Sequence, residues 1–504
     1  MLYLCSSIIY STIIYKLILK YLNINKTVAT SISNENSTFS LLIGQDINSN
    51  KIYLPERSLY QNILITGTIG SGKTSSAIYP FSEQLIKYNC NFSDKKLGIL
   101  FLDVKGNFVN QILYYAKKYN RLSDLIIIGT DSNETYNPLN KPNLKPAVLA
   151  NRLKVILSLF SPNNSESYWL DKVEQVLSEA IKLCRLYNDG YVNFKEIHTL
   201  INNKSYFYDK VSYLKNKFHK NSFNDSSLYD LYSSITFFEN EFYSLDERTI
   251  SILKSEITRI TNVFVSDYDI LNKFSPDKNN ITFEGFNSLI NDGKLVVLSM
   301  NIAEYKNLSK IMAAYLKLDF QSEVLQRIKS DNLPSSRSVC FICDEFHEYV
   351  TSTDSDFFSQ SREAKCINIV ATQSYSSLLN TLNNESCVKV IIQNLINKLW
   401  FRSDDLFTIE NAQKQIGKEE KEKISTTISE NAKETFYNYL LNDFNSINSN
   451  ISETHNKYLQ TDFIYDVNSF SRDLETFSCL SFLSDGNKII TPCKLHMFPY
   501  FLNY

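Results

Sequence analysis

The sequence lacks an excess of positive charge. Among its 504 residues, 52 Lys and Arg stand against 54 Asp and Glu, so the formal net charge is −2 at pH 7. A protein with this balance does not coat nucleic acid, and any contact with DNA phosphates requires a local basic surface, such as the lumen of a ring. Glycine and proline are also scarce, at 12 and 10 residues. We attribute their scarcity, with the abundance of Asn, Ile, Lys, Ser and Tyr, to a low-GC coding bias.

The nine cysteines form no obvious metal-binding pattern. Cys340 and Cys343 make the only C-x-x-C spacing, and they lie in an apolar run that is expected to be a strand. Residues three apart in a strand point to opposite faces. We therefore expect small buried side chains in a reducing cytosol rather than a metal site.

Long apolar runs are missing except at the start of the chain. Residues 2–22 would form a helix of about 31 Å at about 1.5 Å per residue, close to the thickness of a bilayer core. Lys16 and Lys20 lie at one end of this run, and Lys26 follows. No basic stretch precedes it, which argues against a cleaved signal peptide. We expect residues 1–26 to form an apolar helix, either a membrane anchor or an interfacial or buried helix.

From Asn62 onward, short apolar strands alternate with helical stretches, the pattern of a parallel sheet with helical crossovers. This pattern predicts an α/β fold. A β-hairpin with an Asp-Gly turn is expected over residues 476–495. The other expected strands cover residues 62–66, 97–103, 124–129, 294–300, 339–343, 367–372 and 397–402.

One long segment interrupts the alternating pattern. Residues 165–275 show helical spacing and no convincing strand, so we expect an all-α domain inserted into the α/β core. The two parts of the core would then be residues 34–164 and 276–504. Residues 27–50 are polar and are expected to be a linker. Residues 418–470 are polar and rich in Asn and Ser, with weak helical spacing near residues 434–443.

The strongest motif lies between the first strand and a helix, and it fits the P-loop pattern G-x-x-x-x-G-K-[ST]. Its glycines allow backbone amide groups to approach phosphates closely. Lys73 would reach the β- and γ-phosphates, and the Thr74 hydroxyl would bind Mg²⁺. Glycine is scarce here, so a chance match is improbable and we expect ATP binding. The phosphate-binding residues are Gly67, Thr68, Ile69, Gly70, Ser71, Gly72, Lys73 and Thr74.

A second motif follows the apolar strand 339–343, which ends in Asp344-Glu345. This is the pattern of a Walker B element. Asp344 would hold Mg²⁺ through its water shell, and Glu345 would orient or deprotonate the attacking water. An acidic pair at a strand end is common, so its weight comes from the P-loop that accompanies it.

Gln373 follows the strand 367–372, at the edge of a parallel sheet that faces the nucleotide. Its amide could sense the γ-phosphate or position water, and an ordinary capping or loop role is the alternative. Arg362 falls near the end of the preceding helix and by itself indicates only a solvated charge. In a ring it could reach the γ-phosphate of a neighbouring subunit. His347 has no metal-ligand companions and is expected to be structural or exposed.

Two weaker motifs complete an ordered set. Asp103-Val104-Lys105-Gly106 follows the second strand, and Tyr136-Asn137-Pro138-Leu139 follows the third. With the P-loop, the Asp344-Glu345 pair, Arg362 and Gln373, they resemble the TraG/TraD-type conjugative coupling ATPases of type IV secretion systems, over roughly residues 41–500. Each motif is weak alone, but their order and spacing are specific.

The resemblance implies a RecA-like motor domain, a homo-hexamer and a tether to the cytoplasmic face of the bacterial cell membrane. Such proteins bring a relaxase with its single-stranded DNA to the secretion channel and use ATP and Mg²⁺ to drive transfer. By position, Lys73, Glu345 and Gln373 are catalytic, Thr74 and Asp344 bind the metal, and Arg362 matches a trans-acting arginine finger. The family usually has two transmembrane helices, whereas this sequence has at most one.

Two other functions remain open from the sequence. A DNA translocase of the FtsK/HerA type shares the motor chemistry, although Tyr136–Leu139 and the helical insert favour the coupling protein. A non-motor receptor would bind ATP only to hold a ring together and recruit proteins. Glu345 argues against the receptor, which does not need a hydrolytic carboxylate. The protein would be cytoplasmic if its N-terminal helix does not span the membrane.

Overall fold

The structure is a computed structural model. It describes residues 39–502, except residue 104 and the segments 161–166, 221–224, 330–336, 433–434, 439–442 and 447–448. The predicted helix over residues 1–26 lies outside this part of the chain. In the described residues, no helix combines the length and the hydrophobicity that a membrane crossing requires. The chain divides into a larger unit, Met1–Ser403 with Leu474–Tyr504, and a smaller unit, Asp404–Asp473.

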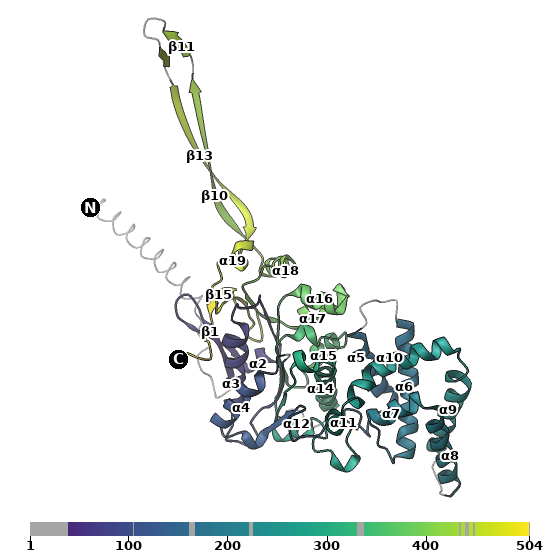
Figure 1. The fold of residues 1–504 in the computed structure, drawn as a ribbon. Helices are drawn as coiled ribbons and strands as arrows, with labels where there is room; N and C mark the ends of the chain where they lie inside the picture. Colours follow the sequence, from purple (N-terminus) through teal and green to yellow (C-terminus); the bar gives the residue numbers. More distant parts are fainter. Residues whose placement is uncertain are drawn as a thin grey trace. The chain divides into compact units, whose positions relative to one another are not determined.

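The larger unit is built around a single 11-stranded sheet, most of which is parallel (Figure 1). All seven parallel strands lie within two residues of the predicted ones, so the predicted α/β fold with a parallel sheet is confirmed. In spatial order they are β9 (Asn397–Phe401), β3 (Ile63–Thr66), β8 (Cys366–Thr372), β7 (Val339–Cys343), β4 (Gly98–Leu102), β6 (Leu295–Leu298) and β5 (Leu125–Ile128).

Four antiparallel strands extend the sheet beyond β9. In spatial order they are β14 (Ser478–Phe482), β15 (Cys493–His496), β1 (Ser40–Gln45) and β2 (Lys51–Pro55). β14 and β15 form the predicted hairpin, although β15 is shorter than expected. Its turn closes where the Asp485 amide donates to the Lys488 carbonyl at 3.0 Å.

The prediction that residues 27–50 form a linker is wrong for β1. Leu41 and Ile43 of this strand are buried in the core, and Gln84 pairs with the backbone of Leu42 through two hydrogen bonds of 2.8 and 3.0 Å. The apolar alternation is only two residues long in a polar context. β1 pairs with the following strand β2 and also with β15, which lies more than 400 residues away in the sequence, where no local pattern can indicate it.

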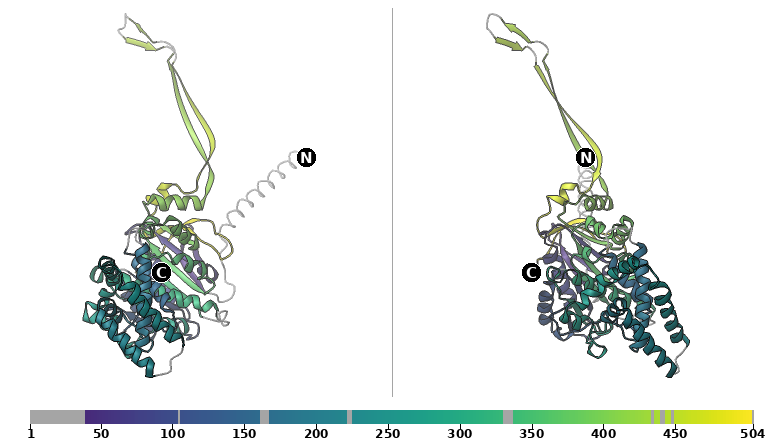
Figure 2. Two further views of the ribbon diagram at one scale, coloured as in Figure 1. Left: turned by 90° about the vertical axis from the view of Figure 1, so that its right-hand side faces the viewer. Right: turned by 45° about the vertical axis from the view of Figure 1, so that its right-hand side comes forward.

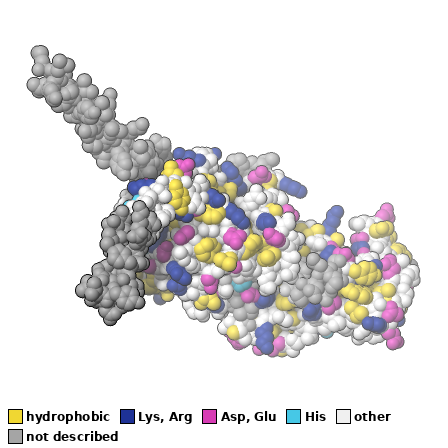
Figure 3. All heavy atoms as spheres, turned by 90° about the horizontal axis from the view of Figure 1, so that it is seen from above, with side chains coloured by type: hydrophobic (Ala, Val, Ile, Leu, Met, Phe, Trp, Pro, Cys, Tyr) yellow, Lys and Arg dark blue, Asp and Glu magenta, His cyan; other side chains and the backbone are white. Residues whose placement is uncertain are grey.

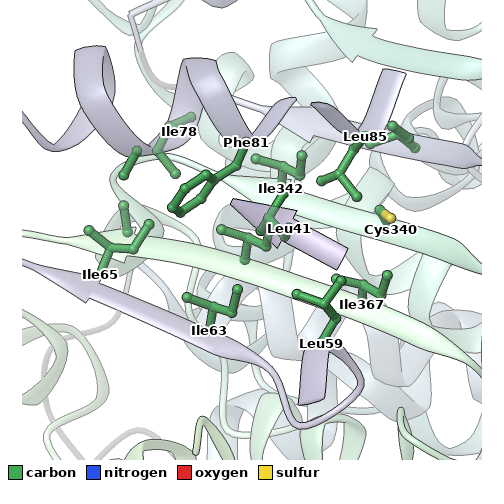
Figure 4. Close-up of a cluster of buried hydrophobic side chains, with 14 of the residues drawn as sticks. Leu41, Leu59, Ile63, Ile65, Ile78, Phe81, Leu85, Cys340, Ile342 and Ile367 are labelled. Atoms are coloured by element: carbon green, nitrogen blue, oxygen red, sulfur yellow. The ribbon is translucent and has the colours of Figure 1, made fainter. Parts of the chain in front are cut away.

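Helices cover both faces of the sheet. On one face, Ile78, Phe81 and Leu85 pack against strand residues such as Ile63 and Ile342 (Figure 4). Phe81 and Leu85 belong to α3 (Tyr79–Lys87), and α4 (Phe108–Lys118) adds to the same core cluster. On the other face lies α14 (Asn307–Gln326), whose Phe320 ring is 6.1 Å from the Phe341 ring of β7. The sheet is thereby buried on both sides, as its continuous apolar strands predict.

Between β5 and β6 the regular elements of the described residues are helices. The predicted boundaries of an inserted domain at residues 165 and 275 stay a prediction, because these helices belong to the same compact unit as the sheet. The longer ones are α5 (Pro146–Ser158), α6 (Ser167–Tyr187), α7 (Phe194–Asn202), α8 (Lys204–Lys220), α9 (Asp225–Thr236), α10 (Glu247–Val265) and α11 (Tyr268–Phe274).

The smaller unit corrects the expectation for residues 418–470. Where weak helical spacing was expected, residues Thr435–Asn438 form the strand β11. On either side, β10 (Lys418–Ala432) pairs with β13 (Ser449–Phe463) in an antiparallel ribbon, and Figure 2 shows its two strands coiled around each other. The ribbon pairs residues up to 45 positions apart, which local helical spacing cannot reveal. The unit also contains α18 (Leu406–Ile416), β11 (Thr435–Asn438), β12 (Asp443–Ser446) and α19 (Val467–Ser471).

Charges of both signs are interspersed on the face shown in Figure 3, where Lys and Arg side chains alternate with Asp and Glu. This mixture agrees with a net charge of only −2. The view shows no broad basic surface of the kind that would coat nucleic acid.

One buried cation in the sheet predicts a pH-dependent stability. Lys398 of β9 is only 2% exposed, and burial lowers its pKa to about 8. The charged form is therefore penalised in the folded state by about 3 kcal/mol relative to an unfolded lysine. The penalty is complete below pH 8 and disappears above about pH 10.5, because the folded state releases its proton first.

We expect Lys398→Met to raise the free energy of unfolding by up to about 3 kcal/mol at pH 7. The gain over wild type should shrink steadily between pH 8 and pH 10. Urea unfolding of both proteins across this range measures the difference. A gain that does not change with pH would mean that Lys398 keeps an ordinary pKa and that the methionine only packs better.

Candidate active site

The carboxyl ends of three adjacent strands bring the predicted catalytic segments together. Thr66 at the end of β3 pairs with Thr372 at the end of β8, and Cys343 of β7 pairs with Val370 of β8. The P-loop follows β3, Asp344-Glu345 follows β7, and Gln373 follows β8. All three therefore leave the sheet at one edge, where α/β proteins bind ligands.

Two glycines of the P-loop adopt backbone conformations that other residues rarely reach. Gly70 has φ 77° and Gly72 has φ 97°. A Cβ atom on Gly72 would lie 2.5 Å from Cδ1 of Phe477, so a side chain is excluded there on steric grounds as well. The loop leads directly into a helical turn at Thr74–Ile78 and then into α3. The amide groups at this helix start can receive an anion.

Lys73 lies folded against the loop that carries it. Its Nζ donates to the carbonyl oxygens of Gly67 at 2.5 Å and Thr68 at 3.1 Å. Burial lowers the pKa of Lys73, while the carboxylates of Asp344 and Glu345 oppose the shift. The ammonium group is thus held beside the P-loop, where a phosphate would replace the two carbonyl acceptors.

Thr74 and Asp344 form the pair expected to bind a metal ion. The Thr74 hydroxyl donates to Oδ2 of Asp344 at 2.6 Å. Burial raises the pKa of Asp344 to about 6, although the Thr74 hydrogen bond opposes the shift. A hydroxyl and a carboxylate are oxygen ligands of the kind that Mg²⁺ prefers, and a cation would compensate the buried negative charge. The donor set therefore fits Mg²⁺.

Glu345 occupies an unusual backbone conformation beside this pair. Its φ and ψ are 50° and 45°, in the left-handed region that a glutamate seldom adopts. Its Oε1 lies 3.2 Å from Nζ of Lys105, and its Oε2 accepts from Nε2 of Gln373 at 3.4 Å. Strain of this kind concentrates at functional sites. The side chain is held at the edge of the phosphate-binding loop.

His347 lies closer to the site than the sequence suggested. Its Nδ1 is 3.2 Å from the Thr372 hydroxyl and 3.8 Å from Oε2 of Glu345. Burial lowers the pKa of His347, with Glu345 and Glu348 opposing the shift. The ring is therefore mostly neutral at pH 7 and lies beside the Glu345 carboxylate.

Arg362 is the one predicted catalytic residue that the structure places away from this edge. It is exposed on the turn between α15 (Asp354–Gln360) and β8, at the amino end of that strand. The seven residues of β8 separate it from Gln373 by about 20 Å at about 3.3 Å per residue. Arg362 cannot reach the phosphate-binding loop of its own chain.

Residues far from the motifs in sequence support the P-loop. The Thr68 amide donates to the carbonyl of Arg402 at 2.8 Å, and the Phe477 amide donates to that of Ser71 at 3.1 Å. The Tyr500 amide donates to the Ser75 carbonyl at 2.9 Å. No sequence signal marked these three contacts, because backbone donors and acceptors carry no residue preference.

The Tyr136–Leu139 motif has a structural role in this fold. The Tyr136 hydroxyl donates to Oδ2 of buried Asp319 at 2.9 Å, and Arg152 donates to Oδ1 at 2.9 Å. Lys141 also pairs with Asp319 at 2.6 Å. The motif thus connects the start of the helical segment to α14. Loss of one of these contacts would leave a buried charge without its partner.

Comparison with known proteins gives a family match to one part of the chain and a shared fold. Residues 338–465 match the family described as the TraM recognition site of TraD and TraG. The bacterial conjugative coupling protein TrwBdeltaN70, in complex with sulphate, is similar with a TM-score of 0.60 at 11% identity, covering 93% of this chain and 90% of that one. TrwB in complex with ADP and Mg²⁺ is similar with a TM-score of 0.58 at 11% identity, covering 93% of this chain and 96% of that one. No protein with a curated description matches.

A further solved structure shares the fold more distantly. VirB4 of Thermoanaerobacter pseudethanolicus is similar with a TM-score of 0.50 at 13% identity, covering 94% of this chain and 99% of that one. Together, the parallel sheet, the P-loop and these likenesses define a RecA-like P-loop protein. The predicted resemblance to the TraG/TraD-type coupling proteins is confirmed by the family match and by the fold of TrwB.

Proposed function

We propose that this chain hydrolyses ATP and uses the energy to couple a relaxase with its single-stranded DNA to a type IV secretion channel. One observation carries the proposal. The P-loop, the Thr74–Asp344 pair and the Glu345–Gln373 pair meet at one sheet edge in a fold shared with conjugative coupling proteins. Glu345 is the residue that separates an ATPase from a receptor that only binds nucleotide.

Each residue would take one role in this reaction. Lys73 binds the β- and γ-phosphates, with Gly67–Thr74 surrounding them. Thr74 and Asp344 hold Mg²⁺, which when bound neutralises charge on the phosphate oxygens. Glu345 orients the attacking water and accepts its proton, and Gln373 positions the Glu345 carboxylate through the 3.4 Å contact. Arg362 would act on a neighbouring subunit in a homo-hexamer.

The proposed partners rest on the comparisons and on the sequence. The match to a TraM recognition site supports a relaxosome protein as one partner. The secretion channel is the partner implied by the sequence resemblance to coupling ATPases. Attachment to the cytoplasmic face of the membrane through residues 1–26 belongs to the same proposal.

The proposal predicts that single-stranded DNA raises ATP turnover several-fold at saturating ATP. A motor whose cycle is completed by moving along DNA turns over faster when DNA is present. Steady-state ATPase rates with single-stranded DNA, with duplex DNA and without DNA measure the effect, and Lys73→Ala protein from the same purification controls for contaminating ATPases.

The three possible outcomes separate the candidate functions. Stimulation by single strands supports the coupling protein. Stimulation by duplex alone would replace it with a duplex translocase of the FtsK/HerA type. Equal rates in all three conditions would favour a receptor without motor activity.

A further inference from the structure

The carboxylate of Glu345 is engaged on both of its oxygens. Oε1 lies 3.2 Å from the ammonium group of Lys105, and Oε2 accepts from Gln373 at 3.4 Å. The Glu345 side chain is 11% exposed, whereas the Lys105 side chain is 59% exposed. These contacts occupy acceptor positions on both oxygens, and the cation lowers the basicity of a carboxylate that must accept a proton from water. The arrangement in this structure therefore restrains the residue that hydrolysis requires.

The fold presents Lys105 to Glu345 from the neighbouring strand. β4 pairs with β7, with Leu102 opposite Cys343, so the segments after both strands leave the sheet side by side. The Asp103 carboxylate accepts from the amides of Lys105 at 3.1 Å and Phe108 at 3.3 Å, which orders the turn. Gly106 completes the turn with φ 71°.

The two partners differ in their freedom to move. The backbone of Glu345 is fixed directly after β7, where its amide also donates to Oδ1 of Asp344 at 2.9 Å. Lys105 carries its charge on a flexible four-carbon stem that is mostly in solvent. When the pair separates, the lysine is the side chain that moves.

A bound γ-phosphate would compete with Glu345 for this cation. It carries more negative charge than one carboxylate, and it would lie beside the P-loop, next to Glu345. ADP has no such group. A cation that leaves Glu345 for the γ-phosphate therefore distinguishes ATP from ADP and frees the carboxylate in the same movement.

We propose that Lys105 is an exchange cation that pairs with Glu345 until ATP binds and then moves to the γ-phosphate, releasing Glu345 to orient water. Lys105 is thus a positioning residue that keeps the hydrolytic carboxylate restrained in the absence of ATP. The proposal rests on the proposed ATPase function and adds a control to the same site. The exchange makes and breaks only ion pairs.

The test is a thermodynamic cycle of nucleotide binding. The four proteins are wild type, Glu345→Gln, Lys105→Ala and the double variant, each titrated with Mg²⁺ and either ADP or the non-hydrolysable imido analogue of ATP. Glu345→Gln should tighten binding of the analogue by about three- to fivefold, the size expected for breaking a partly exposed ion pair. Binding of ADP should stay unchanged.

Removal of the lysine should have the opposite effect. Lys105→Ala should weaken binding of the analogue about tenfold relative to ADP, because a charge-assisted contact to the γ-phosphate is lost. In the double variant, the tightening produced by Glu345→Gln should vanish. Lys105→Arg, which keeps the cation, should restore most of the preference for the analogue. Lys118→Ala removes another lysine from an ion pair, with Glu83 at 2.6 Å, and serves as the control.

The exchange is rejected if Lys105→Ala leaves the ratio of analogue to ADP affinity at the wild-type value. It is also rejected if Glu345→Gln tightens binding of the analogue by the same factor in the Lys105→Ala protein as in the wild-type protein. A wild-type protein that hydrolyses ATP but shows either result rejects the exchange alone. A wild-type protein that binds neither nucleotide rejects the proposed function as well.

Discussion

Lys73→Ala is expected to reduce ATP hydrolysis by at least about 10²–10³-fold, the loss seen when one preorganised donor to developing charge is removed. The Nζ of Lys73 is held by the carbonyls of Gly67 and Thr68 beside the loop that would surround the phosphates. Burial lowers the pKa of this lysine, which means that keeping it charged destabilises the folded state. Its removal should therefore leave the melting temperature close to that of wild type.

Glu345→Gln should lose hydrolysis by a different route. Glutamine keeps the size of the side chain and its contact to Gln373 but cannot accept a proton from water. A general base contributes about 10²–10⁴-fold to the rate, so we expect the variant to bind ATP with Mg²⁺ and stall. Phosphate release and nucleotide binding, measured on the same samples, separate the two variants. A folded Lys73→Ala protein with normal turnover would contradict the phosphate assignment. A Glu345→Gln protein unable to bind nucleotide would make Glu345 structural.

Arg362→Ala is expected to lower the ATPase rate by about 10³–10⁵-fold, as for other arginine fingers, while nucleotide binding stays normal. Arg362 is exposed, and its turn is anchored where the Ser361 hydroxyl donates to Oδ1 of buried Asn62 at 3.3 Å. It lies at the amino edge of the sheet, opposite the P-loop of its own chain. Any role in catalysis must therefore be exerted on another subunit of a ring.

The matched control is the next residue on the same turn. Glu363 is also exposed, so Glu363→Ala should retain wild-type turnover. If Arg362→Ala is equally active, the arginine is an ordinary solvated surface residue.

Mixing two inactive variants tests whether Arg362 acts in trans. A subunit with Arg362→Ala keeps a sound P-loop, and a subunit with Lys73→Ala keeps a sound arginine. In an equal mixture, about a quarter of the head-to-tail interfaces would join an intact Arg362 on one subunit to an intact P-loop on the next. ATPase activity should recover to a corresponding fraction of wild type. Mixtures that demonstrably co-assemble and remain inactive would exclude the trans role.

The sequence alone was sufficient wherever a strong local pattern was present. The parallel strands were predicted to within two residues, because strands buried on both faces are continuously apolar. The P-loop and the Asp344-Glu345 pair were located because their chemistry requires particular residue types at a short fixed spacing. Gln373 was placed at the nucleotide edge because the carboxyl ends of parallel strands share that edge.

The tertiary structure decided everything that depends on pairing between distant residues. β1 and the β10–β13 ribbon were missed because their stability comes from cross-strand partners, while their own sequences are short or polar. The Lys105–Glu345 pair spans 240 residues and exists only because β4 and β7 are neighbours in the sheet. Local pattern thus located the buried parallel strands and the segments that carry the P-loop and Walker B motifs. The order of the strands, which no local pattern encodes, decided which side chains meet.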